Sequence, residues 1–285
     1  MLLKSLNYWS VPGGLDNTLD PVEFMRIAKK HRFPAVELAI GEQQGLCLDS
    51  DEKYCANLLH QAKEIGVQVA SVASGLYWNH AVGDTDPKSR QIAEEQLEKM
   101  IRIASWLKVK TLLFIPGSVD VFFLPNRKPQ RYDEVLKNAT ESIEKILPGA
   151  EEARVQLGIE NVWNKFLLSP LEMAQFIDSF DSEWIGAYVD VGNVAPYGYP
   201  EQWLRILDNR VVGIHFKDFR KSVGTADGFV DLLEGDLNWP EVMAAIKDIG
   251  YDGPVVAEMI PCYQHFAEVR VANTSNAMDA LLGLL

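Results

Sequence analysis

Four apolar, strand-like runs in the second half of the chain each end on a side chain that can bind a metal ion. The runs cover residues 155–160, 186–190, 211–215 and 254–258, and they end on Glu160, Asp190, His215 and Glu258. A buried strand favours Val, Ile, Leu and aromatic residues, so a carboxylate or imidazole at its end needs a partner. Because the runs are spaced like strand–helix units, we expect their ends to meet at one rim of a parallel barrel.

The first half of the chain shows the same alternation of strand-like and helix-like segments. Helix starts are marked by caps such as Asp20-Pro21 and by the Ser169-x-x-Glu172 pattern. Eight strand–helix units are expected in all. The other predicted strands are 6–10, 35–40, 67–73 and 111–115, and the predicted helices begin near residues 20, 51, 86, 132, 169, 200, 240 and 267.

An open, doubly wound sheet would also alternate strands and helices. Such a sheet usually carries a glycine-rich phosphate loop after its first strand, whereas residues 11–15 read Val-Pro-Gly-Gly-Leu and match no such loop. We therefore predict an α/β fold of the single (β/α)8 TIM barrel type. Since no linker or shift in composition divides the chain, residues 1–285 are expected to form one domain.

The composition narrows the range of partners. A net charge of −13 opposes nucleic-acid binding, because phosphate contacts need an excess of Lys and Arg on one face. Three cysteines without a CxxC pair favour free thiols in a reducing compartment. The first residues turn polar too quickly for a signal peptide, and no apolar run is long enough to span a bilayer. We expect a soluble, cytoplasmic protein that binds neither nucleic acid nor membrane.

The four strand endings together predict a mononuclear metal site. Three neighbouring carboxylates repel one another, and a divalent cation removes that repulsion. The predicted ligands are Glu160, Asp190, His215 and Glu258. Oxygen ligands with a single imidazole suit hard cations, so we expect Mn²⁺, with Mg²⁺, Co²⁺ or Zn²⁺ as alternatives.

Two of these ligands are also predicted to be catalytic. A cation with open positions polarises a carbonyl and an adjacent hydroxyl group, which stabilises an enediolate. Removing the proton beside that carbonyl needs a base, and returning it needs an acid. Glu160 ends the fifth strand and Glu258 the eighth, so their carboxylates are expected to face one carbon from opposite sides. Proton transfer between them would invert a stereocentre.

At these residues the chain resembles the xylose-isomerase-like barrel superfamily of sugar and sugar-phosphate isomerases and epimerases. The similarity is greatest to the ketose 3-epimerases and the L-ribulose-5-phosphate 3-epimerase-like proteins. It covers nearly the whole chain and includes Tyr8-Trp9-Ser10, Ser74-Gly75-Leu76, Ile159-Glu160-Asn161, Val189-Asp190-Val191-Gly192-Asn193, Ile214-His215-Phe216-Lys217-Asp218 and Gly250-Tyr251-Asp252-Gly253.

The resemblance implies an isomerase, either a sugar or sugar-phosphate epimerase or an aldose–ketose isomerase. It implies that Glu160, Asp190, His215 and Glu258 hold the metal. It also implies that the two glutamates exchange the proton during C3 epimerisation of a ketose through a cis-enediolate. The implied partner is a small sugar or sugar phosphate, and the implied assembly is a homodimer or homotetramer.

Two positions depart from the free-ketose 3-epimerases. Asn193 stands where those enzymes usually carry His, and Phe166 stands where they carry a second Glu. Both departures argue against a free hexulose as substrate. Asp190-Val191-Gly192-Asn193 followed by His215-Phe216-Lys217-Asp218 resembles the phosphorylated-pentulose branch, with a phosphate expected near Lys217, Arg220 and Lys221. Lys217 and Asp218 are also candidates to support the metal-binding His. The predicted substrate-binding residues are Asn193, Trp163, Asn164, Lys217 and Arg220.

Three other functions are compatible with such a barrel. The same metal site could serve a dehydratase or a hydroxypyruvate-type isomerase, in which the enediolate loses water or is rearranged. A nuclease of the endonuclease-IV type would need a cluster of histidines, and the chain has five His in all. A non-catalytic, sugar-binding barrel is the third alternative, and it would be favoured if the purified protein bound no metal.

Overall fold

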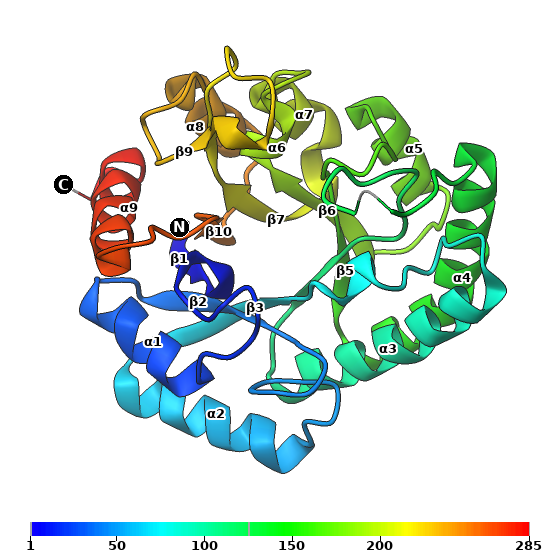
Figure 1. Ribbon diagram of the computed structural model, residues 1–285, viewed down its shortest axis with the longest axis horizontal. Helices are drawn as coiled ribbons and strands as arrows, with labels where there is room; N and C mark the ends of the chain where they lie inside the picture. Colours follow the sequence, from blue (N-terminus) through cyan, green and yellow to red (C-terminus); the bar gives the residue numbers. More distant parts are fainter. Residues whose placement is uncertain (1, 125, 285) are drawn as a thin grey trace.

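A computed structural model describes residues 2–124 and 126–284. Eight parallel strands close into a barrel in the order β1-β10-β7-β6-β5-β4-β3-β2, with helices outside it (Figure 1). The predicted TIM barrel is therefore confirmed. The barrel strands are β1 (Leu3–Asn7), β2 (Ala35–Ala39), β3 (Gln68–Ala73), β4 (Thr111–Phe114), β5 (Gln156–Glu160), β6 (Ile185–Asp190), β7 (Val211–Phe216) and β10 (Pro254–Ala257).

The outer layer consists of eight helices, one after each barrel strand. The predicted caps Asp20 at α1 and Ser169 at α5 are confirmed, because their side chains accept from backbone N–H groups. The helices are α1 (Pro21–Lys30), α2 (Glu52–Ile65), α3 (Pro87–Trp106), α4 (Tyr132–Ala153), α5 (Pro170–Asp178), α7 (Pro200–Leu207), α8 (Trp239–Asp248) and α9 (Ala267–Leu281).

Apolar side chains fill the layer between the strands and the helices. Phe24 on α1, Leu97 on α3 and Ile143 on α4 are fully buried there. Burying a side chain of this size contributes about 1.5–3 kcal/mol relative to exposing it, so this layer stabilises the barrel. In the part of the chain that the structure describes, no helix is both long and apolar enough to cross a membrane.

The first strand lies earlier than predicted. The range 6–10 is wrong because β1 ends at Asn7, whose side chain accepts a hydrogen bond from Trp9 N at 2.7 Å. This cap turns the chain into a 3-10 helix, Tyr8–Ser10. The Ser10 hydroxyl then accepts from Met259 N at 2.9 Å, which ties the turn to the segment after β10.

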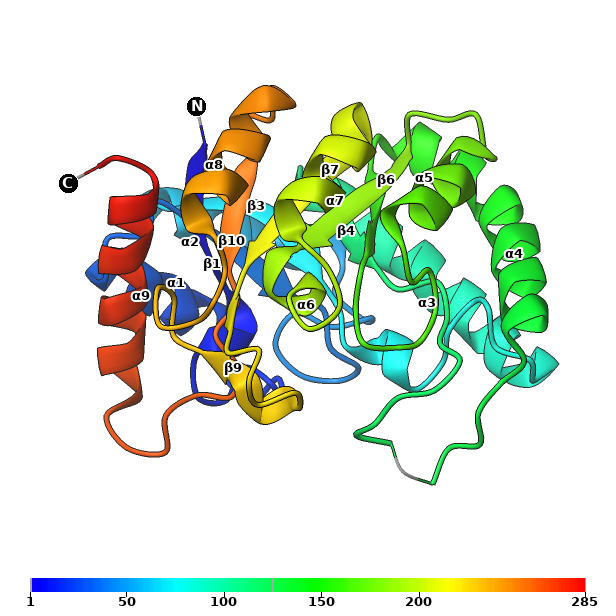
Figure 2. The same ribbon diagram turned by 90° about the horizontal axis from the view of Figure 1, so that it is seen from above.

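Two small elements at the carboxyl ends of the strands were not predicted. One is the short helix α6 (Val191–Val194), which follows β6 directly. The other is an antiparallel pair of β8 (Asp218–Phe219) and β9 (Phe229–Val230), which follows β7. Figure 2 shows β9 at the same end of the molecule as the long loop between β4 and α4. Both elements shape the candidate site.

Candidate metal centre

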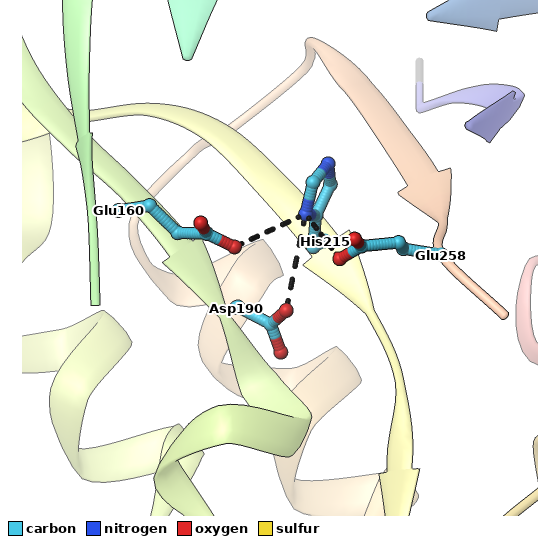
Figure 3. A group of neighbouring side chains, drawn as sticks. All are labelled: Glu160, Asp190, His215 and Glu258. Carbon is cyan, nitrogen blue, oxygen red and sulfur yellow. Dashed lines mark ion pairs between the residues drawn. The ribbon is translucent and has the colours of Figure 1, made fainter. Parts of the chain in front are cut away.

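The structure brings the four predicted ligands together. They come from strands that are neighbours in the barrel, in the order β10-β7-β6-β5. Glu160 and Asp190 are the last residues of β5 and β6, His215 is the last but one of β7, and Glu258 follows β10. One ligand atom from each residue lies within 4.8 Å of the others, and the four side chains point toward one another (Figure 3).

The centre of this group is Nδ1 of His215. It lies 3.1 Å from Glu258 Oε2, 3.4 Å from Glu160 Oε1 and 3.8 Å from Asp190 Oδ2. Nδ1 is buried without a hydrogen-bond partner, and Asp190 Oδ2 is buried with no hydrogen bond and only the ion pair to Lys217 Nζ, 3.0 Å away. Buried polar atoms without a partner are costly, and a shared cation would satisfy them. The donor set is therefore one that fits a divalent metal ion.

A fourth buried acid, Glu37 on β2, holds the other ring nitrogen of His215. Glu37 Oε1 lies 2.7 Å from Nε2 and also accepts from Asn7 Nδ2 at 2.7 Å. Its Oε2 accepts from the hydroxyls of Ser71 at 2.7 Å and Tyr188 at 2.6 Å. A carboxylate on Nε2 keeps the proton there and leaves Nδ1 free to bind a metal.

Strand register explains how Glu37 reaches this position. Asn7 on β1 pairs with Glu37, and Glu37 pairs with Ser71 on β3, so three polar side chains stand side by side. Tyr188 reaches Glu37 from β6, and its ring lies close to Gly213 on the neighbouring strand β7. A Cβ at Gly213 would lie 2.5 Å from that ring, so only glycine leaves room for it. These residues form a polar floor beneath the four ligands.

The two oxygens of Asp190 have different partners. Oδ1 accepts from Asn193 N at 2.9 Å and so caps α6, while Oδ2 faces His215. The Asn161 side chain donates to the backbone carbonyl of Asp190 at 2.9 Å and accepts from its backbone N–H at 2.8 Å. These two hydrogen bonds connect the ends of β5 and β6. These bonds fix the carboxylate in one orientation.

Lys217 is the cation closest to the carboxylates. Its Nζ lies 2.6 Å from Glu258 Oε2 and 3.0 Å from Asp190 Oδ2. The backbone of α6 passes directly over it, since a Cβ at Gly192 would lie 2.4 Å from Lys217 Cβ. Asp218, the other predicted support for His215, instead accepts from Leu233 N and the Trp239 indole, at 2.9 and 2.8 Å. The support for His215 is Glu37.

The environment pushes the pKa values of the two glutamates apart. Burial raises the pKa of Glu160 to about 7, and the charge of Glu258 adds to that effect. Burial alone would also raise the pKa of Glu258, but the charges of Lys217 and His215 outweigh it and lower the value to about 2. Two carboxyl groups with separated pKa values are suited to act as an acid and a base.

The charges of Glu37 and Glu258 outweigh the effect of burial on His215 and raise its pKa well above the ordinary value. For Glu37 the effect of burial is likewise outweighed, by the His215 charge and by hydrogen bonds from His215, Tyr188 and Asn7, so its pKa is lowered. The inner group thus holds four carboxylates, and a bound divalent cation would compensate part of their charge. Binding it requires His215 to lose its Nδ1 proton.

Not all predicted substrate contacts reach the cavity above the ligands. This cavity has a volume of about 600 Å³, and Trp163, Asn193 and Lys217 line it together with Glu160 and Glu258. Trp163 is held there by the hydrogen bond from its indole to Asn193 O, 2.9 Å long.

Asn164, Phe166 and Arg220 have other surroundings. Asn164 is buried, donates to Gly117 O at 2.8 Å and accepts from Phe166 N at 3.0 Å, which shapes its own loop. The Phe166 ring packs against the ring of Tyr132. Arg220 donates to Glu234 O at 2.7 Å. Among the described residues, none of these three lines the cavity.

Comparison with known proteins gives the evolutionary context. Residues 25–278 match the model of the xylose isomerase-like TIM barrel family. A curated relative, L-ribulose-5-phosphate 3-epimerase UlaE of Salmonella choleraesuis, is 24% identical over 261 residues, which cover 90% of this chain and 87% of that protein. A structure of a D-tagatose 3-epimerase-like protein superposes with a TM-score of 0.76 at 18% identity and covers 99% of this chain and 98% of its own.

A third comparison concerns the metal. A structure of the IolI protein with a bound zinc atom superposes with a TM-score of 0.79 at 14% identity and covers 99% of both chains. The expected resemblance and the expected isomerase class are both confirmed by these comparisons. The chain belongs to the xylose isomerase-like TIM barrel family.

Proposed function

We propose that this protein is a divalent-metal-dependent epimerase or isomerase of a ketose, and that it uses Mn²⁺ to invert C3 through a cis-enediolate. The observation that carries the proposal is the placement of Glu160 and Glu258 on either side of His215 Nδ1, at 3.4 and 3.1 Å. Two carboxyl groups on opposite sides of one reacting carbon are what inversion by proton exchange requires.

Glu160, Asp190, His215 and Glu258 would hold the metal ion. When bound, the ion supplies a Lewis acid that polarises the substrate carbonyl and stabilises the enediolate. Mn²⁺ is proposed because three carboxylate ligands and one imidazole suit a hard cation that accepts further oxygen ligands. The buried His215 Nδ1, which has no hydrogen-bond partner, and the buried Asp190 Oδ2 beside it support this assignment.

The separated pKa values support one direction of proton transfer. Glu258, with a pKa of about 2, is ionised and takes the proton from the carbon beside the carbonyl. The raised pKa of Glu160 favours it as the group that returns a proton on the opposite face. Lys217 Nζ lies 2.6 Å from Glu258 Oε2, keeps Glu258 ionised and lines the cavity.

The relatives support the reaction class. UlaE is named as a 3-epimerase of L-ribulose 5-phosphate, and the structural neighbour is named as D-tagatose 3-epimerase-like. Both names describe inversion at C3 of a ketose. A dehydratase on the same barrel would form the same enediolate and then expel water, so the two functions differ in their product.

The test combines metal replacement with isotope exchange. Protein stripped with EDTA should be inactive, and Mn²⁺ should restore C3 epimerisation of a ketose panel in D₂O, with deuterium found by NMR at the inverted carbon. Glu160→Gln and Glu258→Gln should each lower the rate by about 10²–10⁴-fold, because each removes one proton-transfer group. Glu98→Gln, an exposed residue on α3, is the matched control and should behave like the wild type.

Each negative outcome has its own meaning. Substantial epimerisation by either glutamine variant would show that the two-glutamate mechanism is wrong. Loss of water without inversion would identify a dehydratase. If the stripped protein bound no Mn²⁺ and none of the ketoses exchanged deuterium, the catalytic proposal would fail as a whole.

A further inference from the structure

The cavity above the ligands is larger than a single small sugar needs. Its volume of about 600 Å³ lies within the range of roughly 300–1,000 Å³ that is typical of sites for drug-sized ligands. Glu160, Lys217 and Glu258 line its inner end, whereas most of its other lining residues come from loops and short elements that follow the barrel strands. A ketose at the inner end would leave the outer part of the cavity to a further chemical group.

Aromatic side chains line this outer part. Phe123 packs edge-on against Trp78 at 5.0 Å between ring centroids, Phe122 lies 6.1 Å from Trp163, and Trp163 lies 5.1 Å from Phe229. Phe122 and Phe123 contact each other at 5.2 Å, so the rings form one continuous aromatic wall. Rings of this kind bind apolar ring faces.

The two central rings of the wall are unusually exposed. Phe122 is 58% exposed and Phe123 46% exposed, although both line the cavity. Large apolar side chains that remain open beside a cavity commonly mark a surface that a ligand covers. An apolar face on the ligand would bury these rings.

The charges around the cavity oppose a phosphate. Among the described lining residues, the only Lys or Arg is Lys217, and its Nζ is already paired with Asp190 and Glu258. Asp16 and Glu42 also line the cavity and add negative charge there. Phosphate recognition relies on Arg, Lys or exposed N–H donors, so a phosphorylated sugar would find repulsion in place of a binding site.

From this size, lining and charge we infer that the substrate is an uncharged ketose that carries a second ring, and that the aromatic wall binds this ring. The shared chemistry is a neutral ring with an apolar face, either a second sugar or an aromatic substituent. The inference rests on the proposed function for the reacting end of the molecule. It narrows the substrate to a class without phosphate.

A matched series of ligands tests the inference. The probes are D-fructose, D-fructose 6-phosphate, 6-O-glucosyl-D-fructose and 6-O-benzyl-D-fructose, which share the reacting carbons and differ only at O6. Binding to the Mn²⁺-loaded protein is measured by calorimetry and by quenching of tryptophan fluorescence, so the readout does not depend on turnover. At least one ring-bearing probe should bind about tenfold more tightly than D-fructose, which corresponds to about 1.4 kcal/mol, and the phosphate should bind no better than D-fructose.

Variants of the wall show where the ring binds. Phe122→Ala and Phe123→Ala should weaken binding of the ring-bearing probes by a larger factor than binding of D-fructose. The control is Leu171→Ala on α5, which also removes an exposed apolar side chain but lies outside the cavity lining. It should leave the affinity for every probe unchanged. The glucosyl and benzyl probes distinguish a sugar ring from an aromatic ring.

Each remaining outcome is decisive. Tightest binding of D-fructose 6-phosphate would overturn the inference and leave the proposed function intact. Equal binding of D-fructose and both ring-bearing probes, or equal losses for all probes in Phe122→Ala, would also overturn it. If the ring-bearing probes bind tightly but no probe exchanges deuterium, the cavity assignment stands and the proposed catalysis fails.

Discussion

Glu37 provides the most direct test of how the candidate metal centre is held. Its four neighbours all donate to it at 2.6 to 2.7 Å, and all of them are fully buried or nearly so. Glu37→Gln preserves the size of the side chain but replaces one acceptor oxygen by a donor amide. The hydroxyls of Ser71 and Tyr188 can rotate to accept from that amide, whereas Nε2–H of His215 is left with a neutral oxygen.

The expected loss of Mn²⁺ affinity follows from this change in the hydrogen-bond partner of His215. A hydrogen bond to a charged group contributes about 1.5–3 kcal/mol and one between neutral groups about 0.5–1.5 kcal/mol. The bond from His215 should therefore weaken by about 1–1.5 kcal/mol, which corresponds to roughly a tenfold change in binding. Removing the partner behind a metal-binding imidazole typically costs about 10–100-fold in metal affinity. We therefore expect the Kd for Mn²⁺ to rise by about 10–100-fold in Glu37→Gln.

The assay is calorimetric titration of EDTA-stripped protein with Mn²⁺, accompanied by a thermal melt. The control is Asp279→Asn, which breaks the ion pair of Asp279 with Lys4 between β1 and α9, 2.5 Å long. It should lower Tm and leave Mn²⁺ affinity unchanged. Wild-type Mn²⁺ affinity in a folded Glu37→Gln protein would refute the idea that this carboxylate fixes the imidazole.

Three further outcomes follow from the same geometry. Lys217→Met should shift the acid limb of the pH–rate profile to higher pH, because removing the Lys charge raises the pKa of Glu258. An acid limb at unchanged pH would contradict this. Gly192→Ala should lower Tm, since its Cβ would lie 2.4 Å from Lys217 Cβ, whereas Gly149→Ala, where nothing lies within 4 Å, should not. Mn²⁺ affinity should increase with pH, because the raised pKa of His215 means that binding releases a proton; calorimetry in buffers of different ionisation enthalpy measures that release.

The sequence was sufficient to predict the barrel and the convergence of the four predicted metal ligands. Strand ends are informative because parallel strands in a barrel all finish at one rim, so Glu160 and Asp190 on neighbouring strands had to lie close together. The helix starts could also be predicted from the sequence, because a cap such as Asp20 bonds backbone groups only a few residues away. These features depend on local patterns alone.

The polar floor was missed because its signal is spread over distant strands. Glu37 stands in the middle of a short apolar strand, and a single acidic residue there does not indicate which way its side chain points. Its partners Asn7 and Ser71 occupy the same level of the barrel, but this becomes visible only when the strands are paired in register. Comparing polar residues at equal depth in successive predicted strands would have identified the group.

The surroundings of the predicted substrate-binding residues could not be predicted from the sequence, because loops determine them. Asn164 directly follows Trp163 in the sequence, yet its side-chain amide donates to Gly117 O, 47 residues away. Arg220 follows β8, and the turn that joins β8 to β9 directs its side chain to the Glu234 carbonyl. Nothing near these residues in the sequence specifies such long-range partners.

The cap on α6 separates the three carboxylate ligands into two kinds. Asp190 is held by its short side chain, since one oxygen must stay on Asn193 N while the other faces His215. A glutamate at this position would be one methylene too long to do both. Glu160 and Glu258 carry no such cap, and their longer side chains have more torsional freedom. The candidate centre thus combines one carboxylate of fixed orientation with two that have more freedom to reorient, and side-chain length accounts for that difference.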